Sequence, residues 1–147
     1  VCGAVDALGK LHFWRLAIRP GRPVALGQIG STPFVGLPGN PVAVMVTFLL
    51  IARPLILLLS GSTDIIPVHY KVRAGFDYEK KKDRREFIRV RLNMTPDGVP
   101  VAIKFPRDGA GILSSLVESD GLVELPENMT QLVAGNLVDF MPFNELS

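Results

Sequence analysis

A proline–glycine turn at residues 36–41 divides a short apolar strand from a long apolar helix, and this division constrains the fold more than any other feature. The turn reads Gly36-Leu37-Pro38-Gly39-Asn40-Pro41. Asn40 is a good helix N-cap, and Pro41 suits the first helical position because its missing N–H would have had no partner there. The apolar run that follows predicts a helix to about Ser60, with Gly61 ending it.

An earlier turn carries two arginines between prolines. It reads Arg19-Pro20-Gly21-Arg22-Pro23. The prolines fix φ and Gly21 permits a tight turn, so the loop would hold Arg19 and Arg22 close together with little entropy to lose. Two guanidinium groups so placed can clamp a phosphate, a molybdate-like oxyanion or a carboxylate. The simpler alternative is a solvated turn with two solubilising charges.

The segments before and between the two turns predict strands. Residues 12–18, 24–28 and 34–37 are rich in apolar residues, and the short turn at residues 30–33 favours an antiparallel hairpin. Such a hairpin could bring both turns to one edge of a sheet, where a helix N-terminus also favours anions. The two turns together therefore predict an anion pocket at a strand-to-helix junction. Taken alone, the second turn could be a plain strand-to-helix connection with an asparagine cap.

The apolar helix raises the question of a membrane. Residues 42–52 contain only one polar side chain, Thr47, but Arg53 and Pro54 interrupt the run. A spanning helix needs about 20 apolar residues. We therefore expect no membrane segment but a buried helix packed on a sheet, with a kink or a break at Pro54. The alternative is a membrane hairpin formed by residues 42–59.

The pattern changes after residues 61–67. Short strands separated by turn residues then predict a small all-β domain, a partly closed barrel. The expected strands cover residues 68–74, 86–92, 99–105, 121–125 and 136–141, and residues 112–118 could form a short helix. The predicted fold class is thus α/β plus all-β.

Three features of the second half could contact a ligand. The charge run at residues 80–85 lies between two expected strands, which favours a solvated hairpin loop over a phosphate-contacting one. Arg89 lies within a strand and should point in a fixed direction. Residues 109–111, Gly-Ala-Gly, could let a backbone approach a ligand closely, although a turn before a short helix is the favoured interpretation.

Composition excludes several classes of function. Residues 1–65 carry five basic and two acidic side chains, and residues 66–147 carry eleven and twelve, so no continuous basic face for nucleic acid is expected. The single cysteine, Cys2, cannot form an internal disulfide, which favours a reducing, cytoplasmic compartment. No cluster has the spacing of metal ligands, and no GxGxxG or Walker motif occurs. Because the chain lacks an initiator Met and starts in an expected helix tail, we expect a piece of a longer protein.

Residues 13–23 and 36–42 closely resemble the MoeA-type molybdopterin molybdenumtransferases, the family that includes the gephyrin E domain. The two turns at this spacing are highly specific, whereas the matches at residues 85–89 and 109–115 are weaker. The resemblance implies that residues 1–61 are the C-terminal half of a molybdopterin-binding α/β domain. It implies that residues 66–147 are the C-terminal β-barrel domain.

The resemblance also implies a reaction and a set of binding residues. The family inserts molybdenum from molybdate into adenylylated molybdopterin with release of AMP, helped by a divalent cation such as Mg²⁺. Arg19 and Arg22 match its two basic positions, and Arg89 matches an arginine thought to face the same cleft. Ala110 stands where relatives often have Ser. The implied substrate-binding residues are Arg19, Pro20, Gly21, Arg22, Pro38, Gly39, Asn40, Pro41 and Arg89.

The family's acidic residues and Gly-rich pterin loop would lie upstream of residue 1. We therefore expect the Mg²⁺ ligands outside this chain, no catalytic residue that can be assigned within it, and no molybdenum transfer by the chain alone. The resemblance further suggests a cytoplasmic homodimer. The alternative function is a non-catalytic, gephyrin-like scaffold that binds a protein partner.

Overall fold

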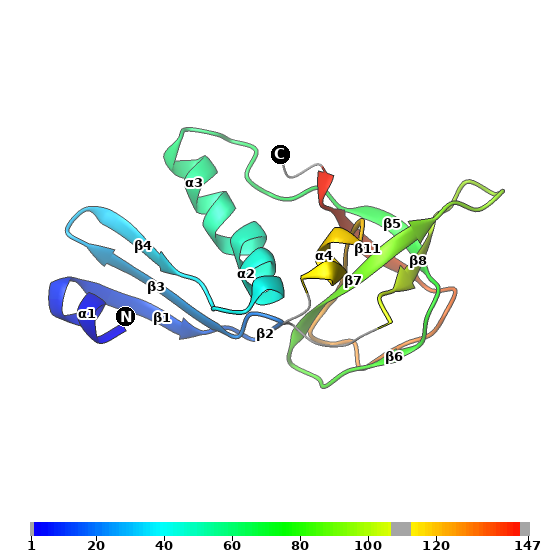
Figure 1. Ribbon diagram of the computed structural model, residues 1–147, viewed down its shortest axis with the longest axis horizontal. Helices are drawn as coiled ribbons and strands as arrows, with labels where there is room; N and C mark the ends of the chain where they lie inside the picture. The colour runs from blue at the N-terminus through cyan, green and yellow to red at the C-terminus, as the bar shows by residue number, and fades with distance from the viewer. Residues whose placement is uncertain (1, 107–112, 145–147) are drawn as a thin grey trace. The chain divides into compact units, whose positions relative to one another are not determined.

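The computed structural model describes residues 2–106 and 113–144, and the chain divides into two compact units, Val1–Ile65 and Ile66–Ser147. The first unit is mixed α/β, and the second is built around a β-barrel with one short helix (Figure 1). The predicted fold class, α/β plus all-β, is confirmed.

The first unit begins with helix α1 (Cys2–Leu8), which is followed by Gly9; the Gly9 N–H donates to the Val5 carbonyl at 2.7 Å. A three-stranded antiparallel sheet follows. Its order is β1 (Lys10–Arg15), β3 (Pro23–Ile29) and β4 (Thr32–Gly36). The β3–β4 pair is the predicted hairpin.

The strand expected over residues 12–18 is in fact two pieces. β1 ends where Arg15 pairs with Pro23, and the separate two-residue strand β2 (Ile18–Arg19) follows. Between them the chain bends, and the Leu16 N–H donates to the Arg22 carbonyl at 2.9 Å. A run rich in apolar residues could not indicate this bend, because the bend depends on how the following turn folds back.

A single helical segment follows the sheet, and its middle differs from the prediction. Helix α2 (Pro41–Thr47) leads through a π-helical turn, η1 (Phe48–Ala52), into α3 (Arg53–Leu59). The Arg53 N–H donates to the carbonyl of Phe48, five residues back. In a regular α-helix the ring of Pro54 would clash with the carbonyl four residues earlier, so the wider turn lets the helix continue where we expected a kink or a break.

The end of this segment is as predicted. Ser60 is the C-cap, Gly61 takes a left-handed φ of 87°, and the Ser62 N–H donates to the Leu57 carbonyl at 2.9 Å. Gly61 is suited to this position because it has no Cβ to clash in the left-handed region.

The helical segment is longer than the uninterrupted apolar run of residues 42–52, on which the expectation of no membrane segment rests. Because the π turn carries the helix past Arg53, Pro41–Leu59 forms 19 helical residues, long and apolar enough to cross a membrane by length and composition. The core helix of a soluble protein can meet the same criteria. Val46 and Leu49 are buried on one side of the segment, whereas Leu58 and Leu59 are exposed at its end.

The second unit contains a closed five-stranded barrel rather than a partly closed one. Its strand order is β7 (Arg85–Asn93), β8 (Val101–Lys104), β5 (Tyr70–Ala74), β11 (Leu137–Pro142) and β9 (Gly121–Leu125), and β9 pairs back onto β7. All pairs are antiparallel except β5–β8. Closure removes exposed strand edges, which a strand-by-strand reading of the sequence could not anticipate.

Alternate residues of these strands fill the barrel. Its fully buried members include Val90, Ala102, Val123 and Leu125. Three short elements complete the unit: helix α4 (Ser114–Val117) and the paired strands β6 (Tyr78–Glu79) and β10 (Gln131–Leu132). The last two are too short to leave a periodic pattern in the sequence.

Candidate functional site

The arginine-bearing turn is packed against helix α2. Gly21 is buried with a φ of 110°, and a Cβ at this position would lie 2.4 Å from the methyl carbon of Thr47. Thr47 is itself fully buried and donates its hydroxyl to the Ala43 carbonyl at 2.7 Å. Gly21 therefore serves two purposes, since it takes a backbone shape that other residues resist and it allows a close approach to the helix.

The side chains of this turn face solvent. Arg19 and Arg22 are both exposed, on either side of the buried Gly21, and Pro20 is joined to Arg19 by a cis peptide bond. The backbone of the turn is thus anchored while its guanidinium groups lie at the surface. This is an arrangement in which a cation pair can meet an anion.

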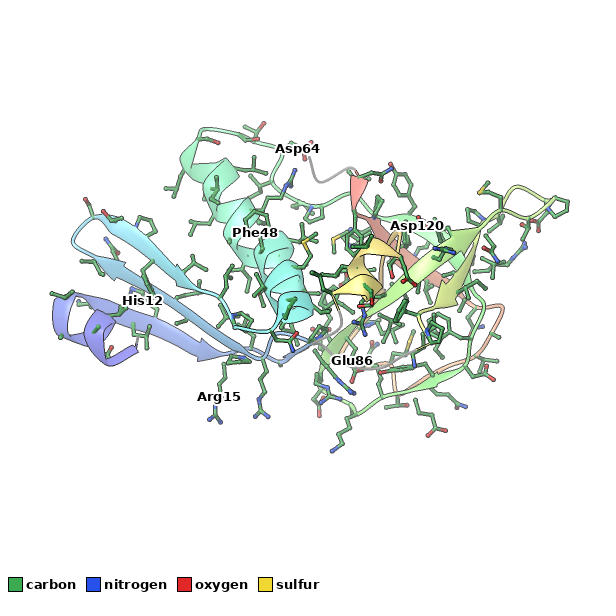
Figure 2. All side chains as sticks on the ribbon, viewed as in Figure 1. His12, Arg15, Phe48, Asp64, Glu86 and Asp120 are labelled. Atoms are coloured by element: carbon green, nitrogen blue, oxygen red, sulfur yellow. The ribbon has the colours of Figure 1, made fainter. Side chains whose placement is uncertain are left out.

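A third arginine lies at the same end of the sheet. Arg15 is exposed and pairs in register with Pro23, the residue after the turn (Figure 2). The sequence analysis did not select it because it stands several residues before the turn, and the pairing that brings it there is a product of the fold. The only signal that could have placed Arg15 here is the register in which its strand pairs with the strand after the turn.

The second turn meets the same end of the sheet. Gly36 ends β4 opposite Ala25, two residues after the start of β3, so the chain leaves the sheet close to where the arginine turn enters it. Pro38 and Asn40 are half-buried, whereas Gly39 and Pro41 are exposed. The two turns are therefore brought to one end of the sheet, as expected from the hairpin.

The helix N-terminus itself offers fewer donors than the sequence suggested. The Asn40 side chain accepts from the Val42 N–H at 3.2 Å and from the Ala43 N–H at 3.5 Å. The Val44 N–H donates to the Asn40 carbonyl at 2.8 Å, and Pro41 has no N–H. The first-turn donors are thus already used, so direct hydrogen bonds to an anion would have to come from the arginines.

Arg89 belongs to the barrel unit. It lies on β7, donates from Nη1 to the Ser115 hydroxyl at 2.6 Å and stands 5.8 Å from the ring centroid of Phe105. Ser115 is fully buried in α4, so the guanidinium has a fixed direction. Residues 109–111, which we singled out for a close backbone approach, lie outside the described residues.

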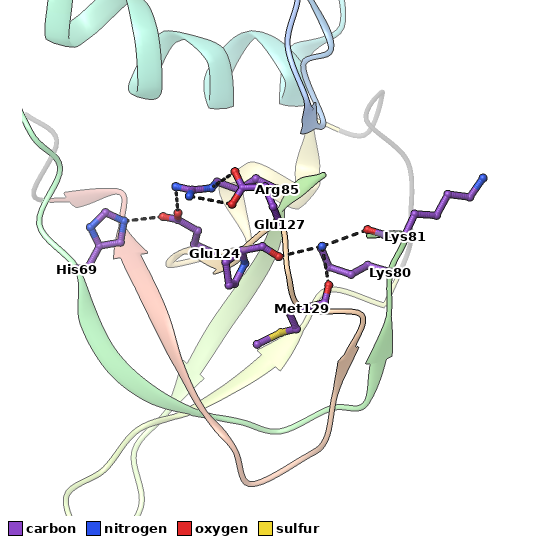
Figure 3. Close-up of polar contacts among 8 residues, drawn as sticks. His69, Lys80, Lys81, Arg85, Glu124, Glu127 and Met129 are labelled. Carbon is purple, nitrogen blue, oxygen red and sulfur yellow. Dashed lines mark hydrogen bonds and ion pairs between the residues drawn. The ribbon is translucent and has the colours of Figure 1, made fainter. Parts of the chain in front are cut away.

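The basic run at residues 80–85 is not simply a solvated loop. Lys80 is buried, and its ammonium donates to the carbonyls of Pro126 at 2.9 Å and Met129 at 2.7 Å (Figure 3). Arg84 donates to Glu86, a carboxylate that is only 1% exposed. Of the cations in the run, only Lys81 and Lys82 are exposed.

Arg85 connects this run to the acidic end of the chain. Its guanidinium contacts both oxygens of Glu127, at 2.9 and 3.0 Å, and one oxygen of Glu124, whose other oxygen lies 2.9 Å from His69 Nε2 (Figure 3). The hydrogen bond from Arg85 lowers the pKa of Glu127, and the same bond raises the pKa of Arg85. These pairs fix the barrel loops and leave less charge for a phosphate than the sequence suggests.

Metal ligands do not gather in this chain as far as it is described. Within residues 2–106 and 113–144, no three His, Cys, Asp or Glu side chains lie close enough together to hold a metal ion. These residues therefore do not fit a magnesium site of their own.

Two family models match the chain, one in each unit. The model described as "Probable molybdopterin binding domain" matches residues 3–57, and that described as "MoeA C-terminal region (domain IV)" matches residues 71–143. Together they cover most of the sequence. The boundary between the two matches falls close to the division between the two compact units.

Individual relatives agree with the family models. The molybdopterin molybdenumtransferase of Haemophilus influenzae is 32% identical over 97% of this chain and 35% of its own length. A molybdopterin biosynthesis MoeA protein of Pyrococcus horikoshii superposes with a TM-score of 0.77 at 29% identity, over 97% of this chain and 34% of its own. A molybdenum cofactor biosynthesis protein of Pyrococcus furiosus gives 0.74 at 31% identity, over 92% and 46%. The chain spans about a third of the length of the curated relatives it matches.

Proposed function

Since the chain belongs to the MoeA family of molybdopterin molybdenumtransferases, we propose that it forms part of an enzyme that inserts molybdate into adenylylated molybdopterin with release of AMP. The substrates are then molybdate and adenylylated molybdopterin, both anionic. The observation that carries this proposal is the arginine turn, whose backbone is fixed against α2 while Arg19 and Arg22 remain exposed.

In this proposal the arginines hold the anionic groups of the substrates. A guanidinium group forms paired, charge-assisted hydrogen bonds with oxyanions, and a fixed turn reduces the entropy lost on binding. Pro38, Gly39, Asn40 and Pro41 shape the floor beside them. Gly39 supports this role, because a Cβ there would meet no atom within 4 Å, so the fold itself leaves the space open. Arg89, which is held by Ser115 in the barrel unit, remains a separate prediction as a substrate-binding residue.

Three further parts of the proposal concern the whole protein. We expect magnesium to assist the reaction through carboxylates outside this chain, because the described residues do not fit such a site. We expect a cytoplasmic homodimer. We also expect the chain alone to transfer no molybdenum, because it spans only about a third of the relatives that carry the transferase name. The scaffold alternative is not favoured, since these relatives are named as transferases.

The binding part can be tested on the chain itself. Equilibrium dialysis with molybdate and with pyrophosphate would compare the unchanged chain with an Arg19→Ala/Arg22→Ala double variant. We expect at least tenfold weaker binding in the variant, since hydrogen bonds to charged groups contribute about 1.5–3 kcal/mol each. The matched control is Lys81→Ala/Lys82→Ala, which removes two exposed positive charges from the barrel and should change binding less than twofold.

Two results would contradict the binding part of the proposal. Equal weakening in both double variants would mean that net charge alone attracts the anion. Unchanged binding in the arginine variant, together with capture of a peptide partner by the barrel, would favour the scaffold instead. The expected inactivity of the chain alone has its own test. The purified chain is incubated with adenylylated molybdopterin and molybdate, and AMP is measured by chromatography. Release of AMP would refute the expected inactivity.

A further inference from the structure

The barrel unit has a pocket whose lining includes none of the residues used so far in the functional argument. Its volume is about 630 Å³, within the range typical of small-molecule sites. It is lined from β5, β11, the end of β7 and the turn that follows α4. All of its lining residues belong to the second unit, so it is complete without the arginine turn.

Aromatic and proline residues are five of the eleven described residues that line the pocket. Tyr70, Phe140 and Phe143 contribute rings, and Pro100 and Pro142 contribute flat apolar surface. Tyr70 is 45% exposed although it is large and aromatic, whereas Phe140 is buried beneath. A wall of this kind favours a flat apolar ring, because aromatic pairs stack and the ring loses contact with water.

One carboxylate stands at this wall with a fixed position. The Asp120 N–H donates to the Val90 carbonyl at 2.9 Å, and the Asp120 carbonyl accepts from the Phe143 N–H at 2.9 Å. Its side-chain Oδ2 accepts from the Leu92 N–H at 2.7 Å, and no hydrogen bond to a described residue involves Oδ1 (Figure 2 labels the residue). Backbone and side chain are thus both anchored, while one oxygen remains for a ligand.

Lys71 is the only cation among the described residues of the lining, and a carboxylate already matches it. The ammonium of Lys71 lies 2.8 Å from Asp139 Oδ1, a neighbour across the β5–β11 pair. With this pair neutral, the pocket presents the negative charge of Asp120 beside an aromatic wall. This polarity is the reverse of that at the arginine turn of the first unit.

We propose that this pocket binds a small molecule that carries a flat apolar ring and a protonated amine. The ring stacks on the aromatic and proline wall, and the ammonium group donates to Asp120 Oδ1. The inference does not depend on the proposed function, because it involves neither the arginines nor the anionic substrates.

Three indole compounds that differ only in their polar end would test the proposal. Tryptamine carries an ammonium group, tryptophol a neutral hydroxyl, and indole-3-propionate a carboxylate. Each is titrated into the ¹⁵N-labelled chain while the amide signals of Leu92, Asp120 and Phe143 are followed. We expect saturable shifts at these amides with tryptamine, about fivefold weaker binding of tryptophol because an exposed ion pair contributes up to about 1 kcal/mol, and the weakest binding for indole-3-propionate.

A substitution then assigns the charge effect to one residue. Asp120→Asn keeps an oxygen that can accept from the Leu92 N–H, and it should lower the affinity for tryptamine to that for tryptophol. Asp64→Asn, at an exposed position of the other unit, removes the same charge and should leave both affinities unchanged. Should Asp120→Asn fail to fold, the comparison of the three compounds on the unchanged chain still tests whether the pocket prefers a positive charge.

Three outcomes would overturn the proposal. Equal affinities for tryptamine and tryptophol would remove the role of the carboxylate. Shifts at amides far from the pocket, or no saturable binding at millimolar concentrations of tryptamine, would remove the site itself.

Discussion

Two segments of this chain that both carry arginines place their charged side chains in opposite ways. In the turn at residues 19–23 the backbone is packed, because Gly21 fits against Thr47, and the charged side chains are exposed. In the run at residues 80–85 the loop is exposed at Lys81 and Lys82, but most of its cations are bound within the barrel.

The difference shows that the density of charge in a sequence does not measure the charge available to a ligand. The longer run has five cations, and the sequence favoured a solvated hairpin loop there over a phosphate-contacting one. Its Lys80, Arg84 and Arg85 instead bind carbonyls and carboxylates of the barrel unit, among them the buried carboxylate of Glu86. Anchoring by backbone contacts, as at Gly21, is what leaves a guanidinium group at the surface.

The strongest test of this comparison is to remove the buried cation. Lys80→Met should lower the free energy of unfolding by about 2–3 kcal/mol, because the carbonyls of Pro126 and Met129 lose a charged donor in a buried position. Urea unfolding followed by circular dichroism would measure the change. Lys82→Met is the matched control and should cost no more than about 0.5 kcal/mol. Similar losses in both variants would mean that Lys80 is no more structural than its neighbour.

A smaller effect is expected at the glycine of the first segment. Gly21→Ala should destabilise the chain by about 2 kcal/mol, because the new Cβ would meet the Thr47 methyl group and the left-handed φ becomes strained. Gly39→Ala is the control, since it has open space and should change stability by less than about 1 kcal/mol. Thermal melts would compare the two. A Gly21→Ala variant as stable as Gly39→Ala would show that the turn is not anchored on α2.

The smallest effect concerns the ion pairs of Arg85. Arg85→Gln should cost about 0.5–1 kcal/mol near neutral pH, as for other partly exposed pairs. In the unchanged chain the pKa of Glu127 lies below its ordinary value of 4.5, so this contribution is present above that pH and is lost as the pH falls through the lower, folded value.

The variant should therefore raise the pKa of Glu127 toward 4.5, and the two proteins should become equally stable in acid. Carbon-detected NMR titration of the Glu127 carboxyl group would measure the first effect, and unfolding at several pH values the second. A Glu127 pKa that does not move on Arg85→Gln would exclude the pairing.

The sequence by itself determined the local structure. Asn40 and Pro41 begin a helix and Gly61 ends it, for reasons of hydrogen bonding and backbone shape that act within a few residues. The β3–β4 hairpin and most of the barrel strands followed from periodicity in the same way. The resemblance to the family also rests on two short turns, and the comparisons confirm it.

Only the tertiary structure decided what depends on contacts between distant residues. The closure of β9 onto β7, the π turn that accommodates Pro54, and the capture of Lys80 by carbonyls more than forty residues away are of this kind. So is the use of the first-turn N–H groups by Asn40, which leaves the arginines as the donors for an anion. A buried polar group must find a partner wherever the fold provides one, and the sequence does not state which groups the fold will bury.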